Sequence, residues 1–132
     1  YHGNLSVAEN YSAAEYLVET FKKIDVKLKI AGMNPPPHLV RVVENVPNVE
    51  LIDSPDDQTL FDLIHHAHIN ILVTEQATGL KLKLLNTLFN GRFCLVNDKM
   101  VEGLDVNGLC YIVNDQNAIR FAVDELMPRR FD

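Results

Sequence analysis

Apolar and polar positions alternate along the chain in a pattern that predicts strands and helices in turn. Short, continuously apolar runs such as INILVT and FCLV are typical of strands that are covered on both faces. Segments with apolar residues three and four positions apart predict amphipathic helices instead. The expected strands are residues 1–4, 26–31, 49–53, 69–74, 93–96 and 109–113. The expected helices are residues 11–24, 38–45, 116–126, and two that run to about residues 67 and 90.

Polar residues and prolines predict where these helices begin and end. Asn10 is expected to cap the first helix, and either Ser54 or Asp56 the third, because their side chains can accept from free N–H groups. Residues 35–37 are all proline and introduce the second helix, and Pro128 ends the last one. Residues 97–107 are expected to form a polar loop.

Strands separated by helical crossovers predict the fold class, a Rossmann-like α/β domain. We expect a doubly wound parallel sheet of about six strands with helices on both faces, formed by residues 1–132 as one domain. In such sheets ligands bind beyond the carboxyl ends of the strands, where the strand order reverses. For the order 3-2-1-4-5-6, this crevice lies between the loop at Gly3 and Asn4 and the loop at residues 74–80.

Composition and charge narrow the possible partners. The chain has 12 basic and 18 acidic residues, a net charge of −6, which argues against nucleic acid or an anionic membrane as the main partner. No apolar run approaches the ~20 residues of a transmembrane helix. Cys94 and Cys110 lie in apolar runs and are expected to be buried free thiols, a cytoplasmic signature. The opening YHGN has no start methionine or signal peptide, so we expect a piece of a longer protein.

One segment suggests an anion site. The stretch TGLKLKLLNTLFNGRFCLV, residues 78–96, predicts a helix with an apolar stripe at Leu80, Leu84, Leu85 and Leu88, then a turn and a buried strand. Gly79 at the helix entry would leave N–H groups open to a phosphate. An ordinary amphipathic helix after a strand would produce the same pattern.

Two further clusters offer alternative chemistry. The first cluster consists of His65, His66 and His68. These histidines could form a metal site, or they could be exposed imidazoles at the end of a helix. The second cluster consists of the carboxylates of Asp53, Asp56 and Asp57. These carboxylates could form a phosphoacceptor site, or they could mark the start of a helix. No dinucleotide fingerprint, P-loop or nucleophile elbow is present.

Several motifs together resemble a known family. They are GNLSVAEN near the start, KIAG, NVELID, KLLNTLFNGRFCLV, and a late VEGL before CYIV. In this order they resemble the C-terminal donor-binding domain of GT-B glycosyltransferases of the family 4-like group, also called glycosyl transferases group 1. The resemblance covers nearly the whole chain, and KLLNTLFNGRFCLV is similar to the family signature K-L-x-E-x-x-x-x-G-x-P-V.

The resemblance implies roles for individual residues. Gly3 would let a sugar approach the backbone, backbone amides after the fourth strand would hold the donor diphosphate, Lys83 would balance its charge, and position 86 would accept the ribose hydroxyls. The donor-binding residues implied are Gly3, Asn4, Thr78, Gly79, Leu80, Lys83 and Asn86, with Glu75 as a possible carboxylate from a neighbouring turn.

The chain also departs from the family pattern. The two glutamates of the E-x7-E pair fall on Thr78 and Asn86, and the basic residues after the first glycine fall on Asn4 and Glu9. Two hypotheses follow. In the first, the full-length protein transfers a hexose such as mannose or glucose from a nucleotide sugar to a glycan or lipid-linked acceptor. In the second, the domain is a catalytically degenerate scaffold or glycan-binding module.

The first hypothesis also implies further domains, a substrate and a location in the cell. A missing N-terminal domain of the same chain would supply the acceptor site, so the isolated domain is expected to be inactive. The nucleotide-diphosphate sugar is the donor substrate, and no cofactor, metal or nucleic acid is expected. We expect a cytoplasmic location, with peripheral attachment to the inner face of the membrane through the missing domain as an option.

Overall fold

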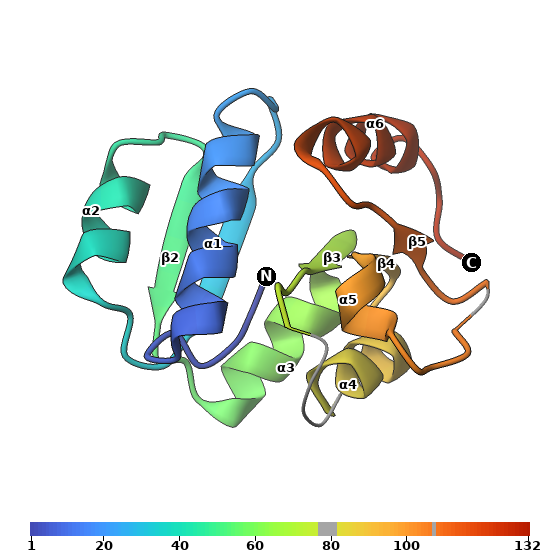
Figure 1. Ribbon diagram of the computed structural model, residues 1–132, viewed down its shortest axis with the longest axis horizontal. Coiled ribbons are helices and arrows are strands. Elements are labelled where there is room, and N and C mark those ends of the chain that lie inside the picture. Colours follow the sequence, from blue (N-terminus) through green and yellow to red (C-terminus); the bar gives the residue numbers. More distant parts are fainter. Residues whose placement is uncertain (77–81, 107) are drawn as a thin grey trace. The chain divides into compact units, whose positions relative to one another are not determined.

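The computed structural model describes residues 1–76, 82–106 and 108–132, in which helices alternate with parallel strands (Figure 1). These residues fall into two compact units, Tyr1–Leu60 and Phe61–Asp132, and each is described by itself. Helix α3, Asp57–His66, begins in the first unit and continues into the second.

The first unit contains α1 (Ala8–Phe21), β1 (Leu28–Gly32), α2 (Pro37–Glu44) and β2 (Val49–Asp53). The two strands pair in parallel from Leu28↔Val49 to Gly32↔Asp53, and His2 adds one parallel bridge to Ala31. Figure 1 shows α1 over this pair, where it contacts β1 and α2, while α2 contacts β2. The predicted apolar stripe of α1 is buried and includes Ala14, Leu17, Val18 and Phe21.

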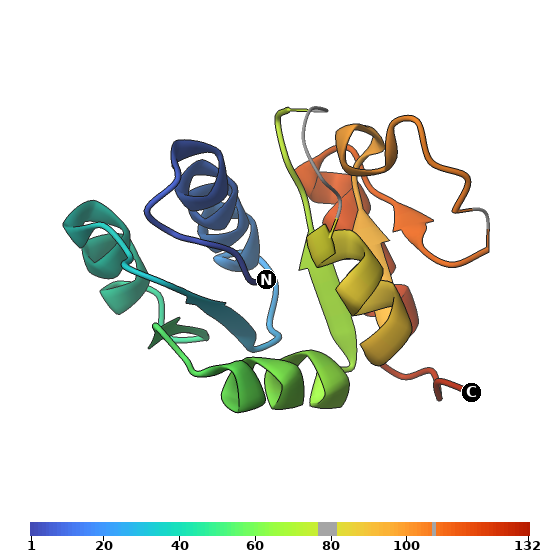
Figure 2. The ribbon, with the colours of Figure 1, turned by 90° about the horizontal axis from the view of Figure 1, so that it is seen from below.

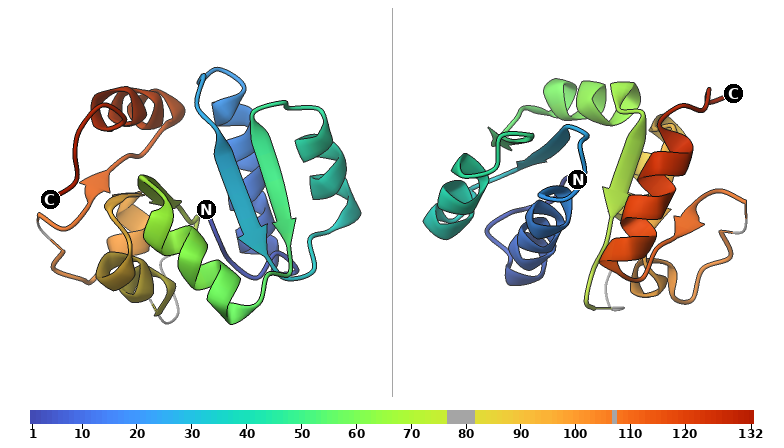
Figure 3. Two further views of the ribbon diagram at one scale, coloured as in Figure 1. Left: turned by 180° about the vertical axis from the view of Figure 1, so that it is seen from behind. Right: turned by 90° about the horizontal axis from the view of Figure 1, so that it is seen from above.

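The second unit contains the rest of α3 and six further elements: β3 (Ile69–Leu72), α4 (Leu82–Asn90), β4 (Phe93–Val96), α5 (Asp98–Val101), β5 (Tyr111–Ile112) and α6 (Gln116–Leu126). Its strands form a parallel sheet in the order β3-β4-β5. Figures 2 and 3 show α4 and α6 on opposite faces of this sheet. Helices on both faces explain why β3 and β4 are apolar along nearly their whole length.

The predicted Rossmann-like α/β class with parallel strands is confirmed, but the prediction of about six strands in one sheet is wrong. The described residues form one sheet of two strands and one of three. The first expected strand contributes only the His2 bridge, because the backbone bends at Gly3 and turns immediately afterwards. The last expected strand shortens to Tyr111–Ile112, whose side chains are exposed at the edge of the sheet.

Some helix ends also differ from prediction. The expected cap Asn10 lies inside α1, which begins at Ala8, and its amide donates to the Asn4 carbonyl oxygen at 3.0 Å. Of the two candidates for α3, Asp56 is the residue that caps, since its carboxylate accepts from the Thr59 N–H at 2.7 Å. Hydrogen bonds from the Thr59 side chain and, as a smaller cause, from the Thr59 N–H hold the pKa of Asp56 below its usual value. The expected loop at 97–107 contains the short helix α5.

Each unit has its own buried apolar side chains. In the first unit the largest are Leu5, Leu17, Ile30 and Leu39. In the second they are Ile64, Leu72, Leu84, Leu95, Ile119 and Leu126. Among the residues that the structure describes, no helix combines the length and the apolar character needed to cross a bilayer.

Candidate functional site

The carboxyl ends of β3 and β4 are tied together by the side chain of Asn97. Its Nδ2 donates to the Thr74 carbonyl oxygen at 2.6 Å, and its Oδ1 accepts from the Thr74 N–H at 3.2 Å. The same oxygen accepts from the Met100 N–H at 3.3 Å and so caps α5. The ends of parallel strands are the part of an α/β sheet where ligands bind, so this tie lies at the edge that sequence analysis selected.

A second amide ties β4 to β5 in a similar way. Asn114 follows β5, and its Oδ1 accepts from the Asp98 N–H at 2.9 Å while its Nδ2 donates to the Asp98 carboxylate at 2.7 Å. In the sheet β3-β4-β5, one asparagine therefore ties each of the two pairs of neighbouring strand exits. Neither Asn97 nor Asn114 was singled out from the sequence, because an asparagine after a strand is also typical of an ordinary turn.

The position of α4 depends on the turn at Gly91 that follows it. A Cβ on Gly91 would lie 2.7 Å from Asn70 Nδ2 and 2.8 Å from the Thr87 carbonyl oxygen, closer than these atoms can approach. Asn70 is buried on β3 and donates to the Ile64 carbonyl oxygen at 3.1 Å. The glycine of the signature thus lets α4 pack directly against a buried amide of the sheet.

The expected stripe of α4 is only partly correct. Leu84 is fully buried and Leu88 is half-buried, but Leu85 is 44% exposed, and Thr87 takes the buried position on that face. Thr87 is tolerated there because its hydroxyl donates to the Lys83 carbonyl oxygen at 2.9 Å, within the helix. The residue at the other end of the expected stripe, Leu80, lies outside the described residues.

Only part of the expected donor site can be located on β3, α4 and the loop between them. Thr78, Gly79 and Leu80 lie outside the described residues, so their proposed contacts stay predictions. Glu75 is exposed in the loop after β3, one residue beyond the Asn97 tie. Lys83 is half-buried in the first turn of α4.

Asn86 is exposed on α4, and its side chain already has a partner within the helix. Asn90 Nδ2 donates to Asn86 Oδ1 at 2.6 Å and to the Asn86 carbonyl oxygen at 3.0 Å. A side-chain carbonyl oxygen has two lone pairs, so one acceptor position remains for a ligand hydroxyl. The position that resembles the ribose-binding glutamate is therefore accessible but weaker as an acceptor than a carboxylate.

Gly3 and Asn4 belong to the first unit, where the opening loop packs on the end of β1. Gly3 donates its N–H to the Ala31 carbonyl oxygen at 3.1 Å, and a Cβ on Gly32 would lie only 1.8 Å from the Gly3 carbonyl oxygen. Asn4 is exposed, and its Oδ1 accepts from the Ser6 N–H at 3.1 Å and the Ser6 hydroxyl at 2.6 Å. The loop is thus a closely packed turn. Its expected convergence with residues 74–80 stays a prediction.

The first turn of α1 carries Glu9, a negative charge at the helix end that otherwise attracts anions. Its charge contributes to a raised pKa of Tyr1, although burial of the phenol is the larger cause. A carboxylate at this position repels a phosphate, whereas the basic residue of the family pattern would attract one.

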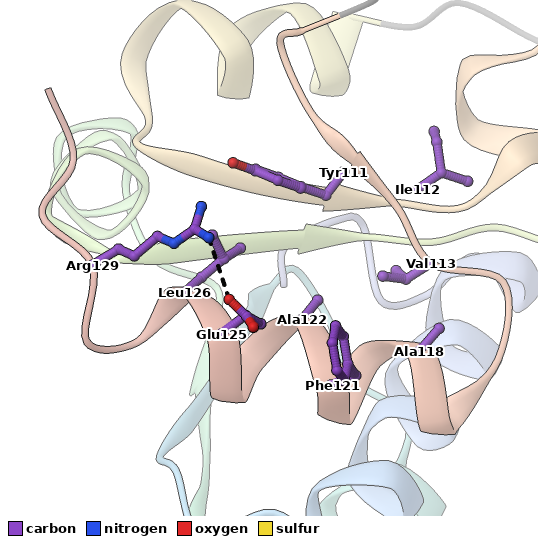
Figure 4. A pocket seen from close by; sticks show the side chains of 9 residues that line it. All are labelled: Tyr111, Ile112, Val113, Ala118, Phe121, Ala122, Glu125, Leu126 and Arg129. Atoms are coloured by element: carbon purple, nitrogen blue, oxygen red, sulfur yellow. Dashed lines mark hydrogen bonds and ion pairs between the residues drawn. The ribbon is translucent and has the colours of Figure 1, made fainter.

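A separate cavity of about 560 Å³ lies between β5 and α6 (Figure 4). Its lining is mostly apolar and consists of Tyr111, Ile112, Val113, Ala118, Phe121, Ala122, Glu125, Leu126 and Arg129. The charged members, Glu125 and Arg129, pair with each other at 3.3 Å. Sequence analysis did not select these residues, since apolar residues on a strand and a helix are usually core. Of the expected donor-site residues that the structure describes, none lines this cavity.

The histidines and aspartates that sequence analysis selected make contacts within the fold. His65, His66 and His68 each place a ring nitrogen near a backbone carbonyl oxygen, those of Asn90, Asp62 and Leu126 respectively. Within the described residues, no group of three or more histidine, cysteine or acidic side chains could hold a metal ion. Asp53 accepts from the Ser54 hydroxyl at 2.7 Å, and the other two carboxylates lie at the start of α3.

The two cysteines are free, as predicted, but differ in burial. Cys94 is buried on β4, and desolvation raises its pKa to about 12, with Cys110 as a smaller cause. Cys110 is only half-buried, which corrects the expectation that both thiols are buried; burial still raises its pKa. A thiol with a raised pKa forms little thiolate, so neither cysteine is suited to nucleophilic catalysis.

Comparison with known proteins tests the resemblance directly. The family model described as glycosyl transferases group 1 matches residues 1–128. No curated protein and no solved structure gives a significant match. Because the family match covers nearly the whole chain, the protein belongs to the glycosyl transferases group 1 family and represents its donor-binding type of domain.

Proposed function

We propose that this domain binds the nucleotide-diphosphate sugar for a glycosyltransferase that moves a hexose, such as mannose or glucose, to a glycan or lipid-linked acceptor. The observation that carries the proposal is the family match over residues 1–128. The parallel sheet β3-β4-β5 supports it, since side chains hold its strand exits in place and α4 is the helix that follows β3 in the chain.

In this proposal the donor lies at the exit of β3 and the start of α4. Transfer breaks the bond between the anomeric carbon and the diphosphate, so negative charge develops on the departing nucleoside diphosphate. In this proposal Lys83 offsets part of that charge, and the backbone amides of Gly79 and Leu80 donate to the phosphate oxygens. Asn86 accepts one ribose hydroxyl, and Glu75 is close enough along the chain to offer a carboxylate to the sugar.

The rest of the reaction belongs to groups beyond this domain. We propose that an N-terminal domain of the same chain provides the acceptor site, because chemistry in this type of enzyme is assembled between two domains. The isolated 132 residues should therefore bind a nucleotide but transfer no sugar. Transfer of radiolabelled sugar by the isolated domain would contradict the two-domain proposal.

Two observations favour the alternative, a degenerate scaffold or glycan-binding module. The side-chain oxygen of Asn86 is already engaged by Asn90 at 2.6 Å, and Glu9 places a carboxylate where the family has a basic residue. Both changes weaken nucleotide binding relative to the family pattern.

Isothermal titration calorimetry with UDP, GDP and their mannose and glucose derivatives separates the two hypotheses. The donor-binding proposal expects saturable binding of one nucleotide series, with the sugar diphosphate bound at least as tightly as the nucleoside alone. No heat with any nucleotide, together with binding of a glycan on an oligosaccharide array, would establish the alternative.

A further inference from the structure

The amide of Asn97 holds the backbone of Thr74 on two atoms, which capping a helix does not require. The ladder between β3 and β4 ends at Leu72↔Val96, and beyond it the two strands no longer pair. There, Asn97 offers Nδ2 to the Thr74 carbonyl oxygen at 2.6 Å and Oδ1 to its N–H at 3.2 Å. One side chain thus supplies the donor and the acceptor that another strand residue would supply.

The tie also fixes the residues that follow. The Thr74 hydroxyl contacts both the Gln76 N–H and the Gln76 carbonyl oxygen at 3.2 Å, so Thr74 links Asn97 to the turn that contains Glu75. Without Asn97, the Thr74 backbone would lose these partners on both polar atoms, and the turn would lose its hydrogen bonds to the exit of β4. A loop that is held in its bound conformation loses less entropy when a ligand arrives.

We propose that Asn97 is a positioning residue of the donor site, acting through Thr74 on the loop that carries Glu75. This inference rests on the proposed function. It assigns Asn97 a role beyond capping α5, a four-residue helix whose Met100 N–H bonds to the same oxygen at 3.3 Å. It also explains why an amide occupies this position, since serine or aspartate caps a helix equally well but cannot hold both atoms of Thr74.

The test uses Asn97→Ser, which keeps a neutral helix cap but is too short to hold Thr74. The matched control is Asn114→Ser, which removes the corresponding tie between β4 and β5. We expect Asn97→Ser to weaken binding of UDP or GDP, whichever the wild type binds, about three- to tenfold, and Asn114→Ser to change it less than about twofold. Amide hydrogen exchange at Thr74 and Gln76 should be faster in Asn97→Ser alone.

Circular dichroism confirms that each variant is folded before titration. If Asn97→Ser fails to fold, Asn97→Asp replaces it, with Asn114→Asp as the control that adds the same charge. Unchanged affinity in a folded Asn97 variant, or equal losses in both variants, overturns the positioning role while leaving nucleotide binding intact. A wild type that binds neither UDP nor GDP overturns the proposed function and the positioning role together.

Discussion

Asn86→Glu tests the departure from the family pattern that bears most directly on nucleotide binding. The ribose of a nucleotide presents two neighbouring hydroxyl donors. Asn86 has one side-chain oxygen with two lone pairs, and Asn90 Nδ2 already donates to it at 2.6 Å. One acceptor position is therefore left for two hydroxyls. A glutamate at this exposed position offers two oxygens, so both hydroxyls find an acceptor even if Asn90 keeps its contact.

The magnitude follows from the exchange of a neutral acceptor for a charged one. Neutral hydrogen bonds contribute about 0.5–1.5 kcal/mol net and charged ones about 1.5–3, so the gain should be about 1 kcal/mol, or about fivefold in Kd. The same geometry makes a second prediction for the partner residue. Asn90→Ala frees the occupied lone pair of Asn86 and should tighten binding by about twofold, since only a neutral bond is gained.

Calorimetry with uridine and UDP, or with guanosine and GDP, measures both effects. A ribose contact should give a similar gain for the nucleoside and the diphosphate, with little dependence on salt. A loss confined to the diphosphate at low salt would show that the new carboxylate repels the phosphates. Unchanged or weaker binding of both ligands, from a wild type that binds them, would refute the assignment of Asn86 to the ribose.

Three further changes have expected outcomes. Lys83→Ala should weaken binding of a nucleoside diphosphate by about 1–2 kcal/mol in calorimetry, and an equal loss in Lys81→Ala would mean a diffuse field instead of a specific contact. Asn48→Ala removes an amide that donates to three carbonyl oxygens at 2.9–3.0 Å, so urea denaturation should show that the free energy of unfolding falls by about 1–3 kcal/mol. The control Asn45→Ala frees one exposed carbonyl and should change the free energy of unfolding little. Similar losses in both variants would argue against a stabilising role for the Asn48 amide. Burial raises the pKa of Cys94 to about 12, so the unfolded state ionises first and the free energy of unfolding should fall as pH rises above about 9; Cys94→Ala should make that fall shallower, and an identical pH profile would contradict this linkage.

Local periodicity was sufficient to predict the bounds of elements that have start and stop residues at both ends. Residues 49–53 and 116–126 were expected as a strand and a helix, and β2 and α6 have these bounds. For α6 the reason is visible in the structure, because Asp115 accepts from the Ala118 N–H at 2.7 Å and caps the helix from the adjacent position. Prolines defined α2 in a similar way, since Pro37 occupies its first turn.

Periodicity failed where a contact from elsewhere decides the outcome. Asparagine is a residue type that often caps helices, but the amide of Asn10 donates to the Asn4 carbonyl oxygen and α1 begins before Asn10. The segment at 109–113 is apolar enough for a longer strand, yet only Tyr111 and Ile112 pair with β4 at the sheet edge. For Asn10 the competing interaction involves a partner that the local pattern does not reveal, and for residues 109–113 the extent of pairing with the neighbouring strand decides the strand's length.

The sequence by itself determined the α/β class, most of the elements and the family, because these depend on residue spacing and on motifs that are contiguous in the chain. Only the tertiary structure decided which side chains hold the strand exits. Asn97 bonds to Thr74, which lies 23 positions away, and Asn48 bonds to carbonyl oxygens 22–27 positions away. Such bonds depend on the register of paired strands and on where each strand ends, and one asparagine looks like any other until those are known.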